Sequence, residues 1–228
     1  MHNPVRDSSS PHRAVTVALD VRCVDEFAAD ARLLRAGAPA VRVATVGETA
    51  VSFGVGERDD AGYLHRAGTA GIPTVRRSTG GTGVFHAPGD LTWSVVVPRE
   101  DPKVGRDFVR AYARLGDGVV RFLRSHHVSA EWTAPPNLSA GYCVLSGRGE
   151  VLAVGPRALG GAAQHLSRTA LLHQGMIPLE VDRGRIAELF DLPAAMLSER
   201  LTGLRELGVR DPPAALAQEL ARELDRRG

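Results

Sequence analysis

Residues 75–97 place a glycine-rich loop between two apolar segments, and this stretch constrains the fold more than any other. Its centre reads Arg76, Arg77, Ser78, Thr79, Gly80, Gly81, Thr82, Gly83, Val84, Phe85 and His86. Glycines let a backbone approach a ligand and expose its N–H donors, while arginines bind phosphate or carboxylate through paired hydrogen bonds. The loop lacks the lysine of a nucleoside-triphosphate loop and the glycine spacing of a dinucleotide site. The residues alone therefore leave open an anion site or a hairpin with solvated arginines.

The composition of the 228-residue chain is typical of a globular domain with a sizeable core. A net charge of +2 with scattered arginines gives no argument for nucleic acid. No apolar run approaches the ~18 residues that a membrane span requires. The two cysteines, Cys23 and Cys143, form no CxxC motif, so we expect neither a disulfide scaffold nor a metal site. The N-terminus has no apolar signal segment, so we expect a cytoplasmic protein.

Hydrophobic periodicity predicts the order of the secondary-structure elements. Helices are expected over residues 24–37, 62–71 and 104–128, strands over 40–46, 49–56, 72–77 and 91–98, strands with tight glycine turns over 142–181, and helices from about 186. The first two strands are expected to be adjacent. Because helices and hairpin-like strands mix without regular alternation, we predict an α+β fold. Its mixed, mainly antiparallel sheet would carry helices on one face and a small helical C-terminal extension.

The loop and its surroundings resemble a known superfamily. The pattern Arg-Arg-x-Ser/Thr-Gly-Gly-x-x-Val-x-His at 76–86, followed by APGDLTWSVVV, is similar to the signature of the lipoate–protein ligase, octanoyltransferase and biotin–protein ligase superfamily. The opening helix and strands, the segment GGAAQHLSRTALLHQGMIPLEV and the last helices match in order. Residues 1–13 are typical of a disordered leader, so we expect a catalytic domain at 14–185 and its helical extension at 186–228.

The resemblance implies which residues bind the substrate. They are Arg76, Arg77, Ser78, Thr79, Gly80, Gly81, Val84, His86, Gly160, Gly161, Ala162, Gln164 and His173. A tunnel between the glycine-rich strands and the strand at 160–164 would hold an acyl chain, with Arg76 and Arg77 at its polar mouth. His86 would hydrogen-bond the carbonyl or thiol region, or close the loop as a structural histidine. His173 would orient the loop beneath the acyl tail.

Cys143 is the candidate nucleophile, because the resembling transferases carry a cysteine fifteen residues before a lysine. Here the lysine position holds Ala158. A thiolate that attacks a thioester forms a second thioester of similar energy. Arg157 could supply charge, but it stays protonated, and it reaches the site only if the strand register shifts. The sole lysine, Lys103, lies in a polar loop far away in sequence, and Cys143 is alternatively a small buried apolar residue.

Three interpretations follow from these residues. The first is an acyltransferase that moves octanoyl or lipoyl between carrier proteins through a Cys143 thioester without a cofactor; an ATP-dependent ligase would add ATP and magnesium. The second is a non-catalytic homologue that binds an acyl ligand or carrier domain. The third is a generic α+β domain. The cysteine favours the first, with an acyl carrier or lipoyl-domain protein as the partner and exposed arginines that steer docking.

Overall fold

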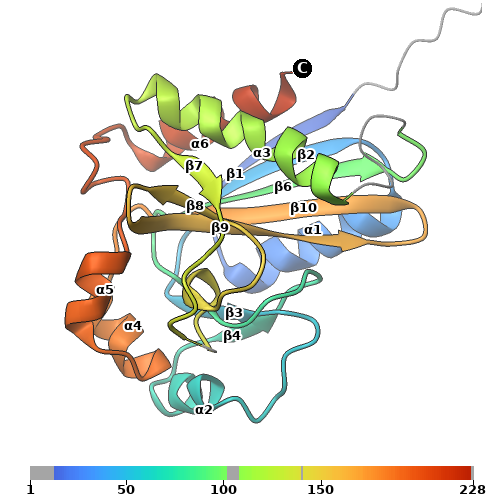
Figure 1. The fold of residues 1–228 in the computed structure, drawn as a ribbon. Coiled ribbons are helices and arrows are strands. Elements are labelled where there is room, and N and C mark those ends of the chain that lie inside the picture. Colours follow the sequence, from blue (N-terminus) through green and yellow to red (C-terminus); the bar gives the residue numbers. More distant parts are fainter. Residues whose placement is uncertain (1–12, 102–107, 140, 227–228) are drawn as a thin grey trace, which may run out of the picture.

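A seven-stranded sheet forms the centre of the molecule (Figure 1). The computed structural model describes residues 13–101, 108–139 and 141–226. In spatial order the strands are β1 (Ala14–Val21), β2 (Ala40–Val46), β6 (Leu91–Pro98), β10 (Ala170–Ile177), β9 (Arg157–Leu166), β8 (Val151–Val154) and β7 (Glu131–Thr133). β1 and β2 run parallel, and the other neighbouring pairs are antiparallel. The predicted mixed, mainly antiparallel sheet is therefore confirmed.

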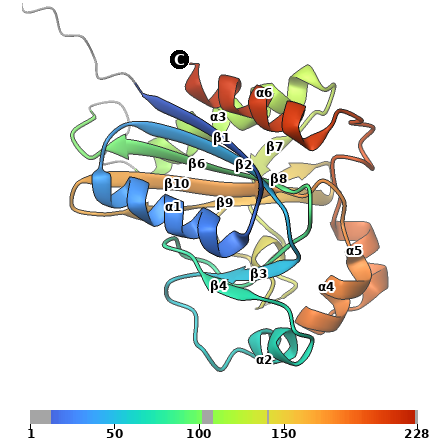
Figure 2. The same cartoon turned by 180° about the vertical axis from the view of Figure 1, so that it is seen from behind.

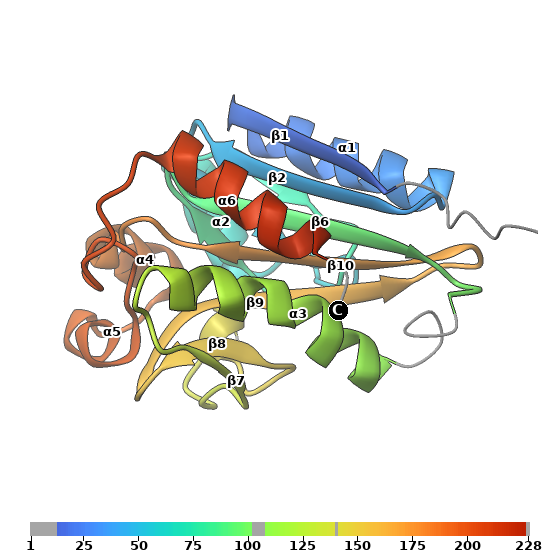
Figure 3. The same ribbon diagram turned by 90° about the horizontal axis from the view of Figure 1, so that it is seen from above.

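Helices cover both faces of this sheet, which corrects the expectation of one covered face. α3 (Phe108–Ser125) and α6 (Pro213–Asp225) lie on one face (Figure 3), and α1 (Cys23–Ala36) lies on the other (Figure 2). Side chains alternate along β6, so Trp93 and Val95 join the core beneath α3 and α6, whereas Val96 packs with Leu34 of α1. The apolar side chains of β6 thus contribute to two hydrophobic cores, one on each face of the sheet.

A second sheet of three strands lies below the first and carries the glycine-rich loop (Figure 1). Its order is β4 (Thr74–Arg76), β3 (Ala50–Phe53) and β5 (Val84–His86), and nearby are α2 (Gly62–Thr69), α4 (Arg183–Phe190) and α5 (Ala194–Arg200). The expected adjacency of residues 40–46 and 49–56 is wrong. β1 and β6 occupy both edges of β2, so β3 pairs with β4 and β5 instead.

Four other segments differ from the prediction. Residues 143–145 form a short 3-10 helix, η1 (Cys143–Leu145), where a strand was expected. The helical region expected from about 186 is interrupted after Arg200, because Leu201 pairs with Ala158 in a bridge and Gly203 lies against the Leu179 carbonyl. β1 and β7 were not predicted, and five of the eight residues of β1 are exposed to solvent. Residues 1–12 of the expected leader, and Lys103, lie outside the described residues.

Candidate functional site

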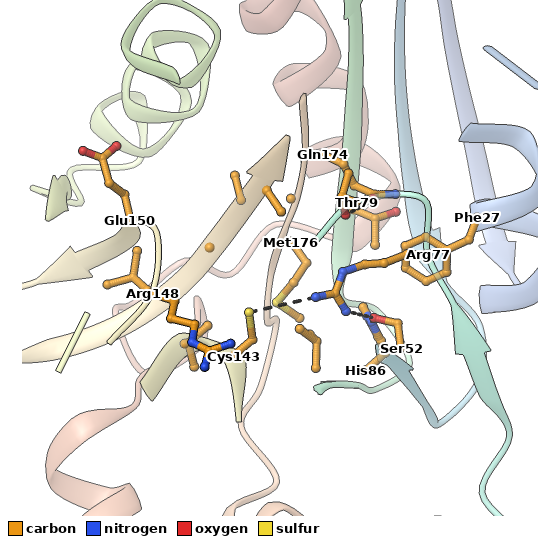
Figure 4. Close-up of a pocket in the computed structure, with 18 residues that line it drawn as sticks. Phe27, Ser52, Arg77, Thr79, His86, Cys143, Arg148, Glu150, Gln174 and Met176 are labelled. Carbon is orange, nitrogen blue, oxygen red and sulfur yellow. Dashed lines mark hydrogen bonds between the residues drawn. The ribbon is translucent and has the colours of Figure 1, made fainter. Parts of the chain in front are cut away.

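A pocket lies between the loop that follows β4 and the strands β9 and β10 (Figure 4). Its walls come from both sheets, α1 and η1, so six separate parts of the chain meet there. The lining residues include Phe27, Ser52, Arg77, Thr79, Val84, His86, Thr92, Cys143, Val144, Arg148, Glu150, Gly161, Ala162, Gln174 and Met176. Most of this surface is apolar, and its charged or reactive groups are the guanidinium groups of Arg77 and Arg148, the carboxylate of Glu150 and the thiol of Cys143.

Arg77 is buried inside the loop and shapes it. Its Nη2 donates to the carbonyls of Gly80 at 2.8 Å and Thr82 at 2.9 Å. Its Nη1 donates to Ser52 Oγ at 3.2 Å. Arg77 is 5% exposed, so its guanidinium is desolvated and these acceptors replace its hydrogen bonds to water. The glycine-rich loop is therefore folded around a fixed positive charge.

Cys143 is attached to the same loop through the backbone. Its N–H donates to the Gly83 carbonyl at 2.8 Å, and the Gly83 N–H donates to the Gly141 carbonyl at 2.9 Å. The thiol is partly exposed, and its Sγ lies 4.0 Å from Arg77 Nη2 (Figure 4). The guanidinium of Arg77 is therefore a cation close to the sulfur that would act as the nucleophile. The fold thus brings the candidate nucleophile to the predicted loop.

Gly81 makes this approach of thiol and guanidinium sterically feasible. Its φ is +93°, a region that side chains rarely adopt. A Cβ at this position would lie 2.7 Å from Arg77 Nη2 and 2.8 Å from Cys143 Sγ. A Cβ on the neighbouring Gly80 would meet nothing within 4 Å. Only the second of the two adjacent glycines is therefore required by the site.

His86 joins the pocket through Ser52. Its Nε2 lies 2.8 Å from Ser52 Oγ, the same hydroxyl that accepts from Arg77. Burial, helped by the charge of Arg77, lowers the pKa of His86 to about 3. The ring is consequently neutral near pH 7, and it links β5 to β3 as a hydrogen-bonding group without a charge.

Arg76 lies outside the pocket, which corrects its expected place at the mouth. Consecutive residues of a strand point to opposite sides, so Arg76 turns away as Arg77 turns inward. Its guanidinium stacks over Phe53, pairs with Asp59, and donates to the Glu57 carbonyl at 2.8 Å. It holds the segment after β3 in place.

Arg157 also points away from the pocket, so it does not take the place of the absent lysine. Its Nη1 lies 3.4 Å from Glu206 Oε2 at a half-buried surface. The β8–β9 register shifts at Leu152 and Ala153, but this shift leaves Arg157 at the start of β9, away from Cys143. Ala158 faces a second, smaller cavity that Asp90 and Thr202 also line.

Alternation along β10 separates His173 from the pocket and brings Gln174 into it. His173 packs its ring against Tyr112 and Trp132 on the side of α3, and Gln164 Nε2 lies 3.2 Å from its Nδ1. This position corrects the predicted role of His173 beneath the acyl tail, and Gln164, predicted to bind the substrate, likewise does not line the pocket. Among the other predicted residues, Thr79, Val84, Gly161 and Ala162 line the pocket, whereas Ser78 and Gly160 do not.

A buried polar network supports the inner end of the pocket. Gln174 donates to Asp30 of α1 and accepts from Thr79 Oγ1 at 2.8 Å, while Ser94 Oγ donates to Asp30 at 2.5 Å. Burial, followed by the nearby charge of Glu26, raises the pKa of Asp30 to about 7. The network connects α1 and β10 to the glycine-rich loop, so it fixes the depth of the pocket.

Sequence reasoning missed Ser52, Arg148 and Gln174. Ser52 is a polar residue inside a buried apolar strand, and Arg148 stands between two glycines, so both carried a visible signal. Gln174 gave no such signal, because only the packing of the strand determines whether Gln174 or its neighbour His173 faces the pocket. Among the described residues, no group of three or more His, Cys, Asp or Glu could hold a metal ion. None of the described helices has the length and apolar character needed to cross a membrane.

Residues 19–225 match the family described as lipoyl protein ligase A/B catalytic domain. The octanoyltransferase LipM of Exiguobacterium sibiricum is 30% identical over 146 residues, which cover 60% of this chain and 52% of that protein. The octanoyltransferase LipM of Bacillus subtilis is 29% identical over 136 residues, covering 56% and 49%. The chain thus spans about half the length of the curated relatives it matches.

Solved structures share the fold at low sequence identity. Lipoate-protein ligase A bound with ATP has a TM-score of 0.73 and 20% identity, covering 93% of this chain and 83% of that one. A putative lipoate protein ligase from Thermoplasma acidophilum with bound lipoic acid has a TM-score of 0.70 and 20% identity, covering 93% and 84%. These similarities bear on the fold alone.

Proposed function

Because the chain belongs to the lipoyl protein ligase A/B catalytic domain family, we propose that it transfers an octanoyl or lipoyl group between carrier proteins through a thioester on Cys143. The observation that carries this proposal is the thiol of Cys143 at the pocket, 4.0 Å from the buried guanidinium of Arg77. The names of the sequence relatives, which are octanoyltransferases, support the same chemistry.

The proposed reaction has two steps. In the first, the Cys143 thiolate attacks the carbonyl carbon of an acyl thioester; the new C–S bond forms and the donor leaves as a thiol, taking the proton that Cys143 lost. In the second, a lysine amine of the acceptor attacks the same carbon. The C–N bond forms, the bond to Sγ breaks, and the amine proton passes to the released thiolate or to water.

The pocket suits an acyl chain next to this thiol. Phe27, Val84, Val144 and Met176 give it apolar walls, and the absence of a side chain at Gly161 keeps it open. Burial of a methylene group contributes about 0.8 kcal/mol, so a medium-length chain would bind well along these walls. The proposed substrates are therefore octanoyl or lipoyl groups, carried on an acyl carrier or lipoyl-domain protein.

Intact-protein mass spectrometry after incubation with octanoyl-carrier protein tests the proposal. We expect an octanoyl-sized mass increase in the wild type, its loss in Cys143→Ala, and its retention in Cys23→Ala. Cys23 is a matched control because it is the other cysteine of the chain and is buried at the start of α1. An unmodified wild type that is folded, or an increase that survives Cys143→Ala, would contradict the proposal.

A non-catalytic acyl-binding homologue is the second candidate, and one observation favours it. Ala158 stands at the position of the expected lysine, and Arg157 pairs with Glu206 outside the pocket. This candidate predicts that the protein binds octanoyl-carrier protein with no covalent product, and that Cys143→Ser binds equally well. Repeating the incubation with lipoate, ATP and magnesium tests the ligase alternative, because only a ligase would then modify a lipoyl domain.

A further inference from the structure

We infer that Arg148 is the catalytic residue that stabilises the negative charge on the acyl carbonyl oxygen while Cys143 is acylated and deacylated. The inference rests on the proposed acyl transfer. It names the group that would take the role expected of a lysine at position 158, where this chain has alanine. It assigns Arg77 a different task, the positioning of the loop and a fixed positive charge.

The segment that carries Arg148 is anchored to the nucleophile. Ser146 Oγ donates to the Cys143 carbonyl at 2.8 Å, and the Gly147 N–H donates to the Pro136 carbonyl at 3.1 Å. Gly147 and Gly149 have φ values of +70° and +72°, so they form a sharp turn with Arg148 at its tip. The backbone at Arg148 is thus held in place relative to Cys143, although the side chain of Arg148 is exposed.

Arg148 lines the pocket with its donors uncommitted. Within the part of the chain that the structure describes, no hydrogen bond or ion pair is found for its guanidinium. Figure 4 shows this group directed toward the region of the pocket that holds Cys143, whereas the carboxylate of Glu150 points away. A guanidinium in this position presents unused N–H groups and a full charge where an acyl carbonyl would meet the thiol.

The N–H groups of Arg77 that lie nearest Cys143, those of Nη2, are by contrast already used. Both of its terminal nitrogens donate to protein oxygens, and those bonds shape the loop. To bind a developing oxyanion through Nη2, the nitrogen 4.0 Å from Cys143 Sγ, Arg77 would have to release the carbonyl of Gly80 or Thr82 and lose the stabilisation of that hydrogen bond. Arg148 can donate without giving up any such partner, so it is the better source of the new hydrogen bond.

Electrostatic stabilisation of this kind requires no proton transfer. When a sulfur or nitrogen nucleophile adds to the carbonyl, the π electrons move onto oxygen, and they return when the leaving group departs. An arginine stays protonated throughout, so it lowers the barrier by charge and hydrogen bonding alone. Removal of one such donor commonly reduces a rate by about 10²–10³-fold.

The experiment measures single-turnover formation of octanoyl-Cys143 by intact mass spectrometry over a range of donor concentrations. The variants are Arg148→Ala, Arg148→Lys and, as a control, Arg168→Ala, an exposed arginine outside the pocket. Two donors are used, octanoyl-carrier protein and the octanoyl thioester of N-acetylcysteamine, which has no protein surface to dock. Thermal unfolding confirms that each variant is folded.

We expect Arg148→Ala to reduce the maximum acylation rate about 10²–10³-fold with both donors, and to change the half-saturating concentration less than about threefold. Arg148→Lys should recover about tenfold of the loss, and Arg168→Ala should stay within about twofold of wild type. A loss confined to the carrier protein, or to the half-saturating concentration, would overturn the inference in favour of docking. An unchanged rate in Arg148→Ala overturns the inference alone, whereas a wild type that never acylates overturns the proposed function and the inference together.

Discussion

The guanidinium of Arg77 lies 4.0 Å from the thiol of Cys143, although 66 positions separate the two residues in the chain. The pair forms because the Gly83 carbonyl accepts from the Cys143 N–H, which ties η1 to the glycine-rich loop. Arg77 cannot move freely, since Ser52, Gly80 and Thr82 hold its nitrogens. The pairing of Cys143 with Arg77, on which the proposed acyl transfer depends, is therefore held by hydrogen bonds within the protein.

The two adjacent glycines of the loop should respond differently to substitution. Gly81→Ala would force a Cβ to within 2.8 Å of Cys143 Sγ at a positive φ, which costs about 1–3 kcal/mol in backbone strain alone. We expect a lower free energy of unfolding and at least a tenfold slower acylation of Cys143. Gly80→Ala, with nothing within 4 Å of its Cβ, should stay within about 1 kcal/mol of wild type. Urea denaturation and intact mass spectrometry would measure both, and equal behaviour of the two variants would contradict this account.

The two adjacent arginines should also differ. Arg77→Met leaves the Gly80 and Thr82 carbonyls without their buried donor, and an unsatisfied buried group costs about 1–3 kcal/mol. We expect a loss of about 2–4 kcal/mol in the free energy of unfolding. Arg76→Met removes a partly exposed ion pair with Asp59, worth about 0–1 kcal/mol, together with the stacking on Phe53 and the hydrogen bond to the Glu57 carbonyl, so we expect a smaller loss than in Arg77→Met. Chemical denaturation compares them, and a larger loss in Arg76→Met would show that the loop is supported from outside.

Substitution at Gly161 should restrict the length of the acyl group. A Cβ there would meet Val144 Cγ1 at 3.5 Å, an ordinary contact, so Gly161→Ala should fold normally. Gly161→Leu would extend further into the pocket and occupy space that an acyl chain needs. We expect the leucine variant to lose acylation by octanoyl thioesters at least tenfold more than acylation by acetyl thioesters. Parallel loss with both thioesters would indicate a distorted site instead.

Arg157→Ala should leave acyl transfer within about twofold of wild type. Its guanidinium pairs with Glu206 at the surface, and such pairs contribute about 0–1 kcal/mol. The measurement is the rate of octanoyl-Cys143 formation, beside Arg148→Ala as the variant expected to fail. A tenfold loss in Arg157→Ala would mean that β9 changes register during the reaction.

Stability should fall as the pH rises from 6.5 to 8. Burial raises the pKa of Asp90 to about 8, against the lowering effect of the Ala87 and Leu179 N–H groups, whereas an unfolded aspartate has a pKa of about 3.9. The folded state therefore binds more protons than the unfolded state in this window, so the free energy of unfolding decreases with pH. Asp30, with a pKa of about 7, acts in the same direction.

Asp90→Asn removes one of these titrations. We expect the decrease between pH 6.5 and 8 to become smaller by about 1–2 kcal/mol, because the amide does not ionise. The buried His86 and His173, whose pKa values burial lowers to about 3, affect stability mainly below pH 6.5 and leave this window clear. Urea denaturation at each pH gives the slope, and an unchanged slope in the variant would assign the effect to Asp30.

Several features followed from the sequence because they depend on local order. The helix at 23–36 and the strand at 91–98 were predicted nearly to the residue, since their apolar spacing and bounding glycine or proline are local signals. The glycine-rich loop and Cys143 were predicted as parts of one site from the resemblance, and the structure has them in contact through Gly83.

Tertiary structure alone decided which member of each neighbouring pair enters the pocket. Strand alternation states that Arg76 and Arg77, or His173 and Gln174, point to opposite sides, but the inner side depends on what packs against the sheet. The separation of β2 from β3 was likewise set by β6, a strand distant in sequence that occupies the free edge of β2. The sequence determined which chemical groups this protein has, and long-range pairing decided which of them meet, because no local pattern records a partner that lies 66 residues away.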